Sequence, residues 1–383
     1  MKLKDCCTII AGQSPESKYY NTEGIGIPFF QGKADFGEVY PTIRVYCSQP
    51  TKIAEKDDIL LSVRAPVGPT NLSPGRVCIG RGLTAIRPSE ILNLKYLLHY
   101  FRSFDAQFQQ KGTGTTFKAI TQDIVRNLEI PIPSLEEQER IVARLEELFS
   151  ELDNGVETLR KTKQQLTVYR QAVLETAFRE CASKENVQFG DILSEKPRNG
   201  YSPKGVDYQT KYRNLTLTAT TSGYFRDNCF KYVDIDIDDD SYLWVKHNDI
   251  LIQRANTIEY VGTAVLYQGE DNRYVYPDLM MKCHTKDGIN PQFVVYQLQS
   301  RVCKTHFREH ATGTSGSMPK INQQTVMTAP IVMTSLDEQE RIVKQIGERL
   351  SVCDSIEKTV DTALLQAEAM RQSILKQAFE GRL

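Results

Sequence analysis

The chain repeats itself, and this repeat limits the possible folds more than any other feature of the sequence. The segment Ser134–Val142, SLEEQERIV, returns as Ser335–Val343, SLDEQERIV, 201 residues further on. Arg170–Leu174 returns at the same offset as Arg371–Leu375, with no insertion or deletion in between. Self-similarity at one fixed offset indicates a duplicated structural unit. We therefore expect a single two-part unit that is used twice.

Both repeated segments have the pattern of long helices. None of the 16 prolines falls in 134–181 or 334–383, where proline would break a helix. Each segment opens with a capping box, the first formed by Ser134 and Glu137, which can satisfy the free amides of a helix N-terminus. Apolar residues then recur at three- and four-residue steps, which is typical of a coiled-coil seam. At 1.5 Å per residue, each helix would span roughly 60–70 Å.

An apolar seam must be covered, and the other copy of the helix is the nearest partner. We therefore expect the two helices to form an antiparallel intramolecular coiled coil; the alternative is that each helix packs on its own domain as ordinary core. The remaining segments contain short β-branched and aromatic runs bounded by Gly, Pro or Asp, which are typical of strands. The predicted fold class is mixed α/β (α+β), with two globular domains, two long helices and a pseudo-twofold internal repeat.

The repeat also sets the predicted domain boundaries. They are a first globular domain at residues 1–133, a central helix at 134–181, a second globular domain at 182–333 and a C-terminal helix at 334–383. A chain of 383 residues is long enough for two or three domains. The globular segments correspond more loosely, since the run Asp58–Leu60 before Arg64 resembles the run Asp249–Leu251 before Arg254.

Charge and cysteine content narrow the class of protein. The net charge of −1 shows no basic footprint of the kind that nucleic-acid-binding domains carry. The balance is uneven, because residues 1–133 hold 16 Lys and Arg against 12 Asp and Glu, while both helices are acidic. Nine cysteines without a CxxC pair favour a reduced chain over a disulfide or zinc framework. With no signal peptide and no long apolar run, we expect a cytoplasmic protein.

Motifs for catalysis and metal binding are largely missing from the sequence. There is no GxxxxGK[ST] phosphate loop, and Gly24–Gly26 lacks the third glycine of a dinucleotide fingerprint. His306 and His310 share one helical face but are expected to pack or face solvent, and the acidic run Asp234–Asp240 is expected to form a solvated turn rather than a metal site. We assign no catalytic residue and no metal ligand.

One tetrapeptide, Asn290–Phe293, is similar to the Asn-Pro-Pro-aromatic signature of methyltransferases that act on the amino group of adenine. Here the second proline is replaced by glutamine, and no glycine-rich cofactor loop precedes the motif. A helix start explains the residues better, with Asn290 as the N-cap and Pro291 at the first helical position.

The repeated EQERIV stretches, each followed about forty residues later by Ala-Phe, resemble the repeated regions of type I restriction–modification specificity subunits. The order of globular domain and helix, used twice, is similar as well, so the resemblance covers the whole chain. The second copy ends in Ala378–Gly381 with the glycine usual for that family, whereas the first runs through Ala177–Cys181 without it. This departure leaves the end of the first helix in question.

The resemblance implies a DNA-reading subunit without catalytic activity of its own. Its target would be bipartite, with two half-sites separated by a nonspecific spacer that the coiled-coil length sets. Two adenine methyltransferase subunits, and optionally restriction subunits, would be its partners. S-adenosylmethionine, ATP and Mg²⁺ would bind to those partners, and no cofactor is expected in this chain.

Candidate contact residues follow from the chemistry of base edges, because Arg and Lys read guanine while Asn and Gln read adenine. The DNA-binding candidates lie in loop-like stretches: Gln31, Lys33, Arg64, Arg76, Arg81, Thr113, Thr115, Thr116 and Lys118 in the first globular domain, and Lys204, Lys211, Arg213, Arg226, Arg254, Asn256, Thr314, Ser315, Ser317 and Lys320 in the second. Arg64 and Arg254 are equally open to a structural role in a salt bridge. The partner-binding candidates lie on the helices: Gln138, Arg140, Gln339 and Arg341.

Two other classes stay open at this point. A coiled-coil scaffold that does not bind DNA would purify without a methyltransferase. A degenerate methyltransferase would bind S-adenosylmethionine as an isolated chain.

Overall fold

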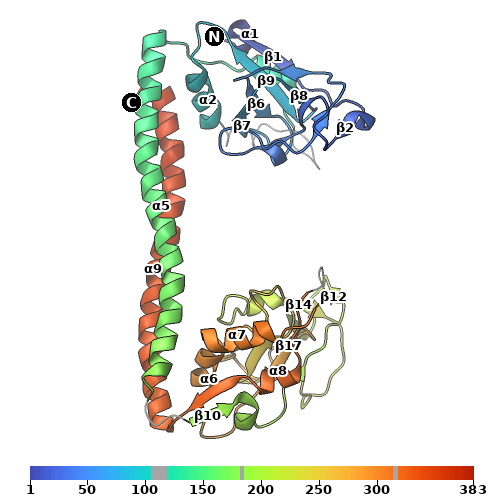
Figure 1. Cartoon of the computed structure of the whole chain (residues 1–383), viewed down its shortest axis with the longest axis vertical. Helices are drawn as coiled ribbons and strands as arrows, with labels where there is room; N and C mark the ends of the chain where they lie inside the picture. Colours follow the sequence, from blue (N-terminus) through green and yellow to red (C-terminus); the bar gives the residue numbers. More distant parts are fainter. Residues whose placement is uncertain (105–118, 182–184, 314–317) are drawn as a thin grey trace. The chain divides into compact units, whose positions relative to one another are not determined.

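The computed structural model divides the chain into two compact units (Figure 1). The structure describes residues 1–104, 119–181, 185–313 and 318–383. Unit 1 comprises Met1–Arg160 with Asp361–Leu383, and unit 2 comprises Lys161–Val360. The boundaries fall inside the two long helices, α5 (Leu135–Arg179) and α9 (Leu336–Phe379). Each helix therefore belongs in part to both units. The boundaries predicted from the sequence instead place the helices apart from the globular domains.

Unit 1 contains two sheets. The first is antiparallel in the order β1 (Cys7–Ala11), β9 (Leu83–Pro88), β6 (Ile59–Ser62) and β7 (Thr70–Leu72). The second has the order β2 (Tyr20–Asn21), β4 (Tyr46–Cys47), β3 (Ile27–Phe30), β8 (Val77–Ile79) and β5 (Ile53–Ala54), and β3 and β8 are parallel. The helical elements are α1 (Leu3–Cys6), α2 (Leu94–Ser103), α4 (Gln122–Arg126) and the 3₁₀ turns η1 (Ser17–Tyr19) and η2 (Lys33–Asp35).

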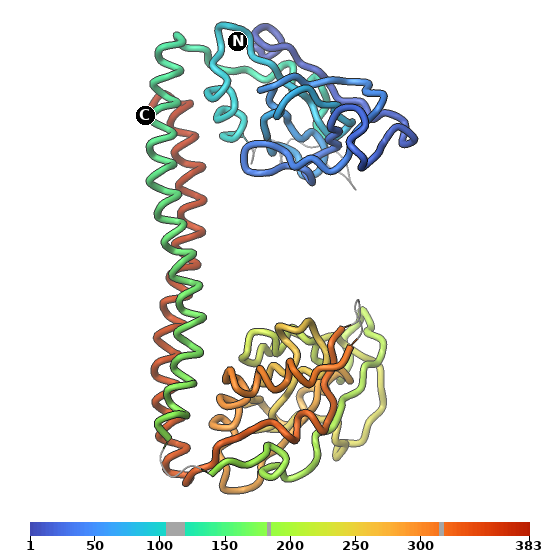
Figure 2. Tube along the Cα trace, viewed as in Figure 1, coloured from blue at the N-terminus to red at the C-terminus, as the bar shows by residue number. Residues whose placement is uncertain are grey.

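Unit 2 repeats the first of these sheets. Its strands follow in the order β11 (Arg198–Asn199), β17 (Met280–Cys283), β15 (Ile250–Gln253) and β16 (Ala264–Leu266). A second sheet has the order β12 (Gly205–Val206), β14 (Phe230–Val233) and β13 (Tyr212–Leu215), and β10 (Glu185–Gln188) pairs with β18 (Pro330–Met333). The helical elements are α6 (Pro291–Leu298), α7 (Arg301–Glu309), α8 (Gln323–Met327), η3 (Phe189–Ile192) and η4 (Leu217–Ala219). Figure 2 traces this path from sheet to helix in each unit.

The duplication extends to a buried aspartate at the start of one strand in each unit. The Asp58 carboxylate accepts a hydrogen bond from the Glu55 amide and forms an ion pair with Arg87 at 2.7 Å. Asp249 occupies the same place in unit 2, where its carboxylate lies 3.0 Å from His284 Nδ1. Both carboxylates are almost fully buried, so a cationic or hydrogen-bonding partner is needed to offset their desolvation. The correspondence between the two globular segments is confirmed by these contacts.

A second repeated device joins each long helix to its globular part. Asn93 and Asn290 cap α2 and α6 with their side chains. The backbone N–H of each asparagine donates to a glutamine of the repeated motif, Gln138 at 2.7 Å and Gln339 at 2.9 Å. The interpretation of Asn290–Phe293 as a helix start is thereby confirmed, with proline in the first turn.

The expectation that Gln138 and Gln339 face a partner protein is wrong. Their exposed fractions are 0% and 2%. Gln138 Nε2 also donates to the carbonyls of Ile91 and Pro133. A glutamine amide can meet an N–H and two carbonyls at once, which explains why this residue type is found at a buried junction.

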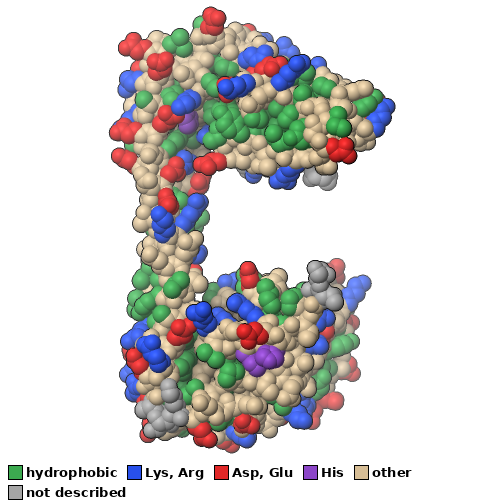
Figure 3. All heavy atoms as spheres, in the orientation of Figure 1, with side chains coloured by type: hydrophobic (Ala, Val, Ile, Leu, Met, Phe, Trp, Pro, Cys, Tyr) green, Lys and Arg blue, Asp and Glu red, His purple; other side chains and the backbone are tan. Residues whose placement is uncertain are grey.

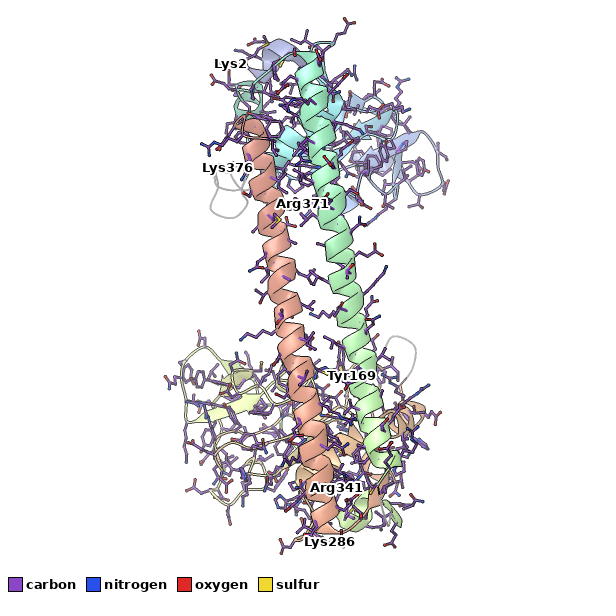
Figure 4. All side chains as sticks on the ribbon, turned by 90° about the vertical axis from the view of Figure 1, so that its left-hand side faces the viewer. Lys2, Tyr169, Lys286, Arg341, Arg371 and Lys376 are labelled. Atoms are coloured by element: carbon purple, nitrogen blue, oxygen red, sulfur yellow. The ribbon has the colours of Figure 1, made fainter. Side chains whose placement is uncertain are left out.

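The long helices run antiparallel to each other in both units (Figures 1 and 4). In unit 1, Arg371 of α9 forms an ion pair with Asp153 of α5, and Figure 4 shows Arg371 beside α5. In unit 2, Arg170 forms the equivalent pair with Asp354 at 2.7 Å. The predicted antiparallel pairing is confirmed, and the equivalent ion pairs show that it follows the 201-residue repeat.

The helices also contribute to the cores of the globular parts, so the alternative expectation holds as well. The residues of α5 and α9 in the unit 1 core are Ile141, Val142, Leu145, Phe149, Leu375 and Ala378. The residues of α5 and α9 in the unit 2 core are Val173, Leu174, Ala177, Ile342 and Ile346. Each helix therefore buries one face against the other helix and further residues against a sheet domain.

All nine cysteines are free thiols. No helix among the described residues is long and apolar enough to cross a membrane.

Replacing Gln138 with leucine should destabilise unit 1. The substitution leaves the Asn93 N–H and two carbonyls without partners, which should lower the free energy of unfolding by about 1–3 kcal/mol. Denaturant unfolding would measure this loss, with the exposed neighbour substitution Glu139→Gln as a control that should change little. Equal stability of Gln138→Leu and the wild type would show that the junction does not hold the helix.

The stability of unit 1 should fall as the pH falls from about 6.5 to 4. Burial lowers the pKa of His99 to about 4, below its ordinary value of about 6.5. Between these values the unfolded chain binds a proton that the folded chain does not, so acid favours unfolding. His99 Nδ1 has no hydrogen-bond partner, so His99→Phe should reduce this pH dependence. Urea midpoints of unfolding for the wild type and His99→Phe at pH 7, 5.5 and 4.5 would test this prediction. The same change of midpoint with pH in both proteins would contradict it.

Candidate nucleic-acid interface

Four of the predicted DNA-binding residues of unit 1 meet around one hollow, which we call the basic hollow. Gln31 follows β3, Arg64 follows β6 and Arg81 follows β8, so loops from three strands contribute. The basic hollow has a volume of about 540 Å³. Its lining residues are Ser14, Gln31, Gly32, Lys33, Ala34, Ser62, Arg64, Ala65, Pro66, Arg81 and Gly82.

Backbone hydrogen bonds hold these loops against one another. The Val63 amide donates to Gly82 O at 2.9 Å, and the Gly80 amide donates to Phe30 O at 2.8 Å. Gly82 is required by close approach, because a Cβ atom there would lie 2.3 Å from Gln31 O. The loops are therefore fixed by the sheets before any side chain binds a ligand.

The basic hollow is electropositive. Lys33, Arg64 and Arg81 line it, and no carboxylate is found among its described lining residues. All three cationic side chains are exposed, and none forms an ion pair with any described residue. Cations without carboxylate partners around a concave surface attract ligands rich in hydrogen-bond acceptors, such as base edges and phosphates.

Arg76 lies outside this cluster. Its guanidinium is 3.9 Å from Glu55, and it does not line the basic hollow. The remaining candidates Thr113, Thr115, Thr116, Lys118, Thr314, Ser315 and Ser317 lie outside the described residues.

In unit 2 the predicted cations are combined with aromatic rings. Arg226 lies over the ring of Tyr224 at 5.2 Å from its centroid and donates to its hydroxyl at 2.9 Å. Arg213 lies over Phe230 at 5.3 Å. Lys211 forms an ion pair with Asp239 at 3.2 Å. Sequence reasoning missed the aromatic partners, although a tyrosine two residues before Arg226 was a usable signal.

Arg254 and Asn256 follow β15 at the edge of the same unit. Arg254 is half-buried, its guanidinium donates a long hydrogen bond of 3.4 Å to Asp278 O, and its buried Nε atom has no hydrogen-bond partner. Lys204 and Lys320 are exposed, and Lys320 exchanges two backbone hydrogen bonds with Thr312.

The structure corrects the proposed correspondence between Arg64 and Arg254. The Ile120 amide donates to Val63 O, and the Ile321 amide donates to Arg254 O, so Arg254 occupies the place of Val63. The counterpart of Arg64 is Ala255, as the backbone pairings of these two residues show. The salt-bridge alternative finds no support either, because neither arginine has a carboxylate partner among the described residues.

On the helices, Arg140 and Arg341 are exposed and form equivalent ion pairs with Glu137 at 2.7 Å and Glu338 at 2.6 Å. Ser134 and Ser335 cap the helix starts, since their hydroxyls accept the Glu137 and Glu338 amides. Figure 4 places Arg341 on α9. Of the four predicted partner-binding residues, the two arginines are therefore available at the surface, unlike the buried glutamines.

Other polar clusters have ordinary structural surroundings. The rings of His306 and His310 lie 4.4 Å apart, and Asp234 accepts the Tyr208 hydroxyl at 3.0 Å. Within the described ranges, no group of three or more His, Cys, Asp or Glu side chains could hold a metal ion. Figure 3 shows positive and negative side chains interspersed over the visible face of each unit, in agreement with the net charge of −1.

Comparison with known proteins finds relatives that are described as type I restriction specificity proteins. The family model described as "Type I restriction modification DNA specificity domain" matches residues 1–167. The type I restriction enzyme MjaX specificity subunit of Methanocaldococcus jannaschii is 41% identical over 167 residues, which is 43% of this chain but only 38% of that subunit's length. The EcoKI specificity subunit of Escherichia coli K12 is 24% identical over 327 residues, covering 81% of this chain and 70% of its own length.

Solved structures show the same fold over the full chain. A structure described under complex assembly and conformational transition of the type I R-M system covers 100% of this chain and 97% of its own, with a TM-score of 0.74 and 17% identity. The HsdS subunit of Thermoanaerobacter tengcongensis covers 100% of this chain and 96% of its own, with a TM-score of 0.51 and 16% identity. Together with the repeated motif and the duplicated fold, these matches show that residues 1–167 resemble the type I restriction–modification DNA specificity domain and that the whole chain is similar to type I specificity subunits.

Proposed function

We propose that this chain is the non-catalytic subunit that reads DNA sequence for a type I restriction–modification complex, with each unit reading one half of a bipartite target. The basic hollow of unit 1 is the observation that carries the proposal. Arg64, Arg81 and Gln31 are residue types that read guanine and adenine in the major groove. They converge from separate loops on one surface, where they can contact the same ligand.

Unit 2 supports the proposal through different chemistry. Its exposed cations lie over aromatic rings, as Arg226 does over Tyr224. A guanidinium held flat on a ring keeps donors free at its edge, so the pair can meet phosphate oxygens or a base. Two units with unlike surfaces would read two unlike half-sites.

The near-neutral charge of the chain implies a partner for DNA binding. Affinity for DNA depends on the number of phosphates that cations neutralise, and positive and negative side chains are mixed over this surface. We propose that two methyltransferase subunits supply much of that neutralisation. They would dock on the equivalent helix faces that carry Arg140 and Arg341, and restriction subunits would join the same complex. S-adenosylmethionine, ATP and Mg²⁺ would bind to those partners.

Replacing one globular part should change one half-site only. A chain in which residues 1–133 come from a divergent family member should methylate a new first half-site and keep the second. Coexpression with the methyltransferase subunit and genome-wide mapping of methylated adenines would show this, with replacement of residues 182–333 as the reciprocal control. A scaffold without DNA binding would direct no methylation, and S-adenosylmethionine binding by the isolated chain would favour the degenerate methyltransferase.

The helix length should determine the spacer. One heptad inserted in α5 after Lys163 and another in α9 after Val360 would preserve the seam, since the coiled-coil repeat is seven residues. Each insertion adds about 10 Å of helix, which corresponds to about three base pairs of DNA. We expect the methylated motif to keep both half-sites while its spacer lengthens by about three base pairs. An unaltered spacer would refute the role of the helices.

A further inference from the structure

The two units differ at one buried position of their first sheets. Ser62, the last residue of β6, pairs with Leu83 of β9, and Gln253, the last residue of β15, pairs with Met280 of β17. Ser62 lies four residues after the buried Asp58, and Gln253 lies four residues after the buried Asp249. Ser62 and Gln253 therefore occupy the same place in the duplicated fold, with side chains of very different length.

In unit 2 the side chain of Gln253 crosses the space between two loops. It is fully buried. Its Nε2 atom lies 3.0 Å from Leu217 O, 2.8 Å from Thr220 Oγ1 and 3.1 Å from Thr221 Oγ1. Its Oε1 atom accepts from Asn256 Nδ2 at 2.6 Å. The Gln253 amide thus links the loop after β15 to the η4 segment that follows β13. The Gln253 side chain fills the space between them.

In unit 1 the same space is open. The Ser62 hydroxyl donates to Arg64 O at 3.1 Å and Pro66 O at 2.9 Å, both in its own loop. The η2 segment that follows β3 is the counterpart of η4, and Gly32, Lys33 and Ala34 form one wall of the basic hollow. Ser62 is among the residues that line the basic hollow. A glutamine at position 62 would extend into the hollow, whereas the serine leaves that part of it open.

The lining favours a ligand rich in hydrogen-bond acceptors. Arg64, Arg81 and Lys33 offer only hydrogen-bond donors, while Ala34, Ala65 and Pro66 give apolar walls. Guanine is the base whose major-groove edge presents two acceptors, N7 and O6, side by side. A phosphate is also rich in acceptors, but it carries no base identity, so a change of base preference in the variants separates the two ligands.

We propose that the basic hollow receives the major-groove edge of a guanine in the half-site of unit 1, and that the residue at position 62 determines whether this subsite is open. The inference rests on the proposed function. In unit 2, Gln253 closes the equivalent subsite, so the second half-site is read without it. The two units would therefore read their half-sites with differently shaped surfaces, although their first sheets have the same arrangement.

Ser62→Gln is the direct test, because it places in unit 1 the side chain that closes unit 2. The full chain is coexpressed with its methyltransferase subunit, and methylated adenines are mapped genome-wide. The wild type should require guanine at one position of the unit 1 half-site, which the replacement of residues 1–133 identifies. Ser62→Gln should lower this discrimination by roughly 10- to 100-fold, the range for loss of one bidentate contact. The second half-site and the spacer should stay unchanged.

Arg64→Ala is the second variant, because it alters an exposed side chain and leaves the buried sheet intact. It should relax the same guanine position. Arg44→Ala removes an exposed charge of unit 1 that does not line the hollow and should leave the base preferences of both half-sites as they are. The intact second half-site in each variant shows that the protein is folded and assembled.

The outcomes separate the possible failures. An unaltered motif in Ser62→Gln and Arg64→Ala, or no guanine in the wild-type half-site, would overturn the inference and leave the proposed function standing. Uniformly weaker methylation by Arg64→Ala with unchanged base preference would identify a phosphate contact and would also overturn it. A wild-type chain that directs no methylation would overturn the proposed function and this inference with it.

Discussion

The antiparallel contact between α5 and α9 is the interaction on which the rest of the structure depends. A helix of 45 residues with an apolar stripe is not stable in water on its own, because its stability comes from burying that stripe. The other copy of the same sequence covers it, and the ion pairs Arg170–Asp354 and Arg371–Asp153 recur at equivalent places. Since both helices also enter the sheet cores, neither globular part is complete without them.

Duplication supplies a common frame that tolerates unlike surfaces. The buried Asp58 and Asp249, and the glutamines at the helix starts, form contacts with backbone or with neighbouring strands. These contacts lie inside each unit and involve no residue of the loops after β3, β6 and β8. The loops can therefore carry cations around a hollow in one unit and cations over aromatic rings in the other. This division suits a protein that would need two different readers on one scaffold.

Errors of the sequence interpretation share one physical cause. Gln138 and Gln339 are polar residues near helix starts, where exposure is the usual outcome, but tertiary contacts bury them. The pairing of Arg64 with Arg254 followed residue type alone, whereas the backbone hydrogen bonds place Arg254 in the position of Val63. Arg76 has the same chemistry as Arg81 in sequence, yet only Arg81 faces the hollow. In each case residue type was visible, and the direction of the side chain was not.

The sequence by itself determined what depends on period and local chemistry. The 201-residue repeat, the two proline-free helices with their serine caps, the helix start at Asn290 and the resemblance to type I specificity subunits all followed from it. Only the tertiary structure decided which of the candidate side chains meet. The basic hollow joins the loops after β3, β6 and β8 and is lined by Ser62, whereas at the equivalent position of the other unit the Gln253 side chain bonds to the opposite loop. Contacts between segments that lie far apart along the chain leave no periodic trace, so packing alone could reveal them.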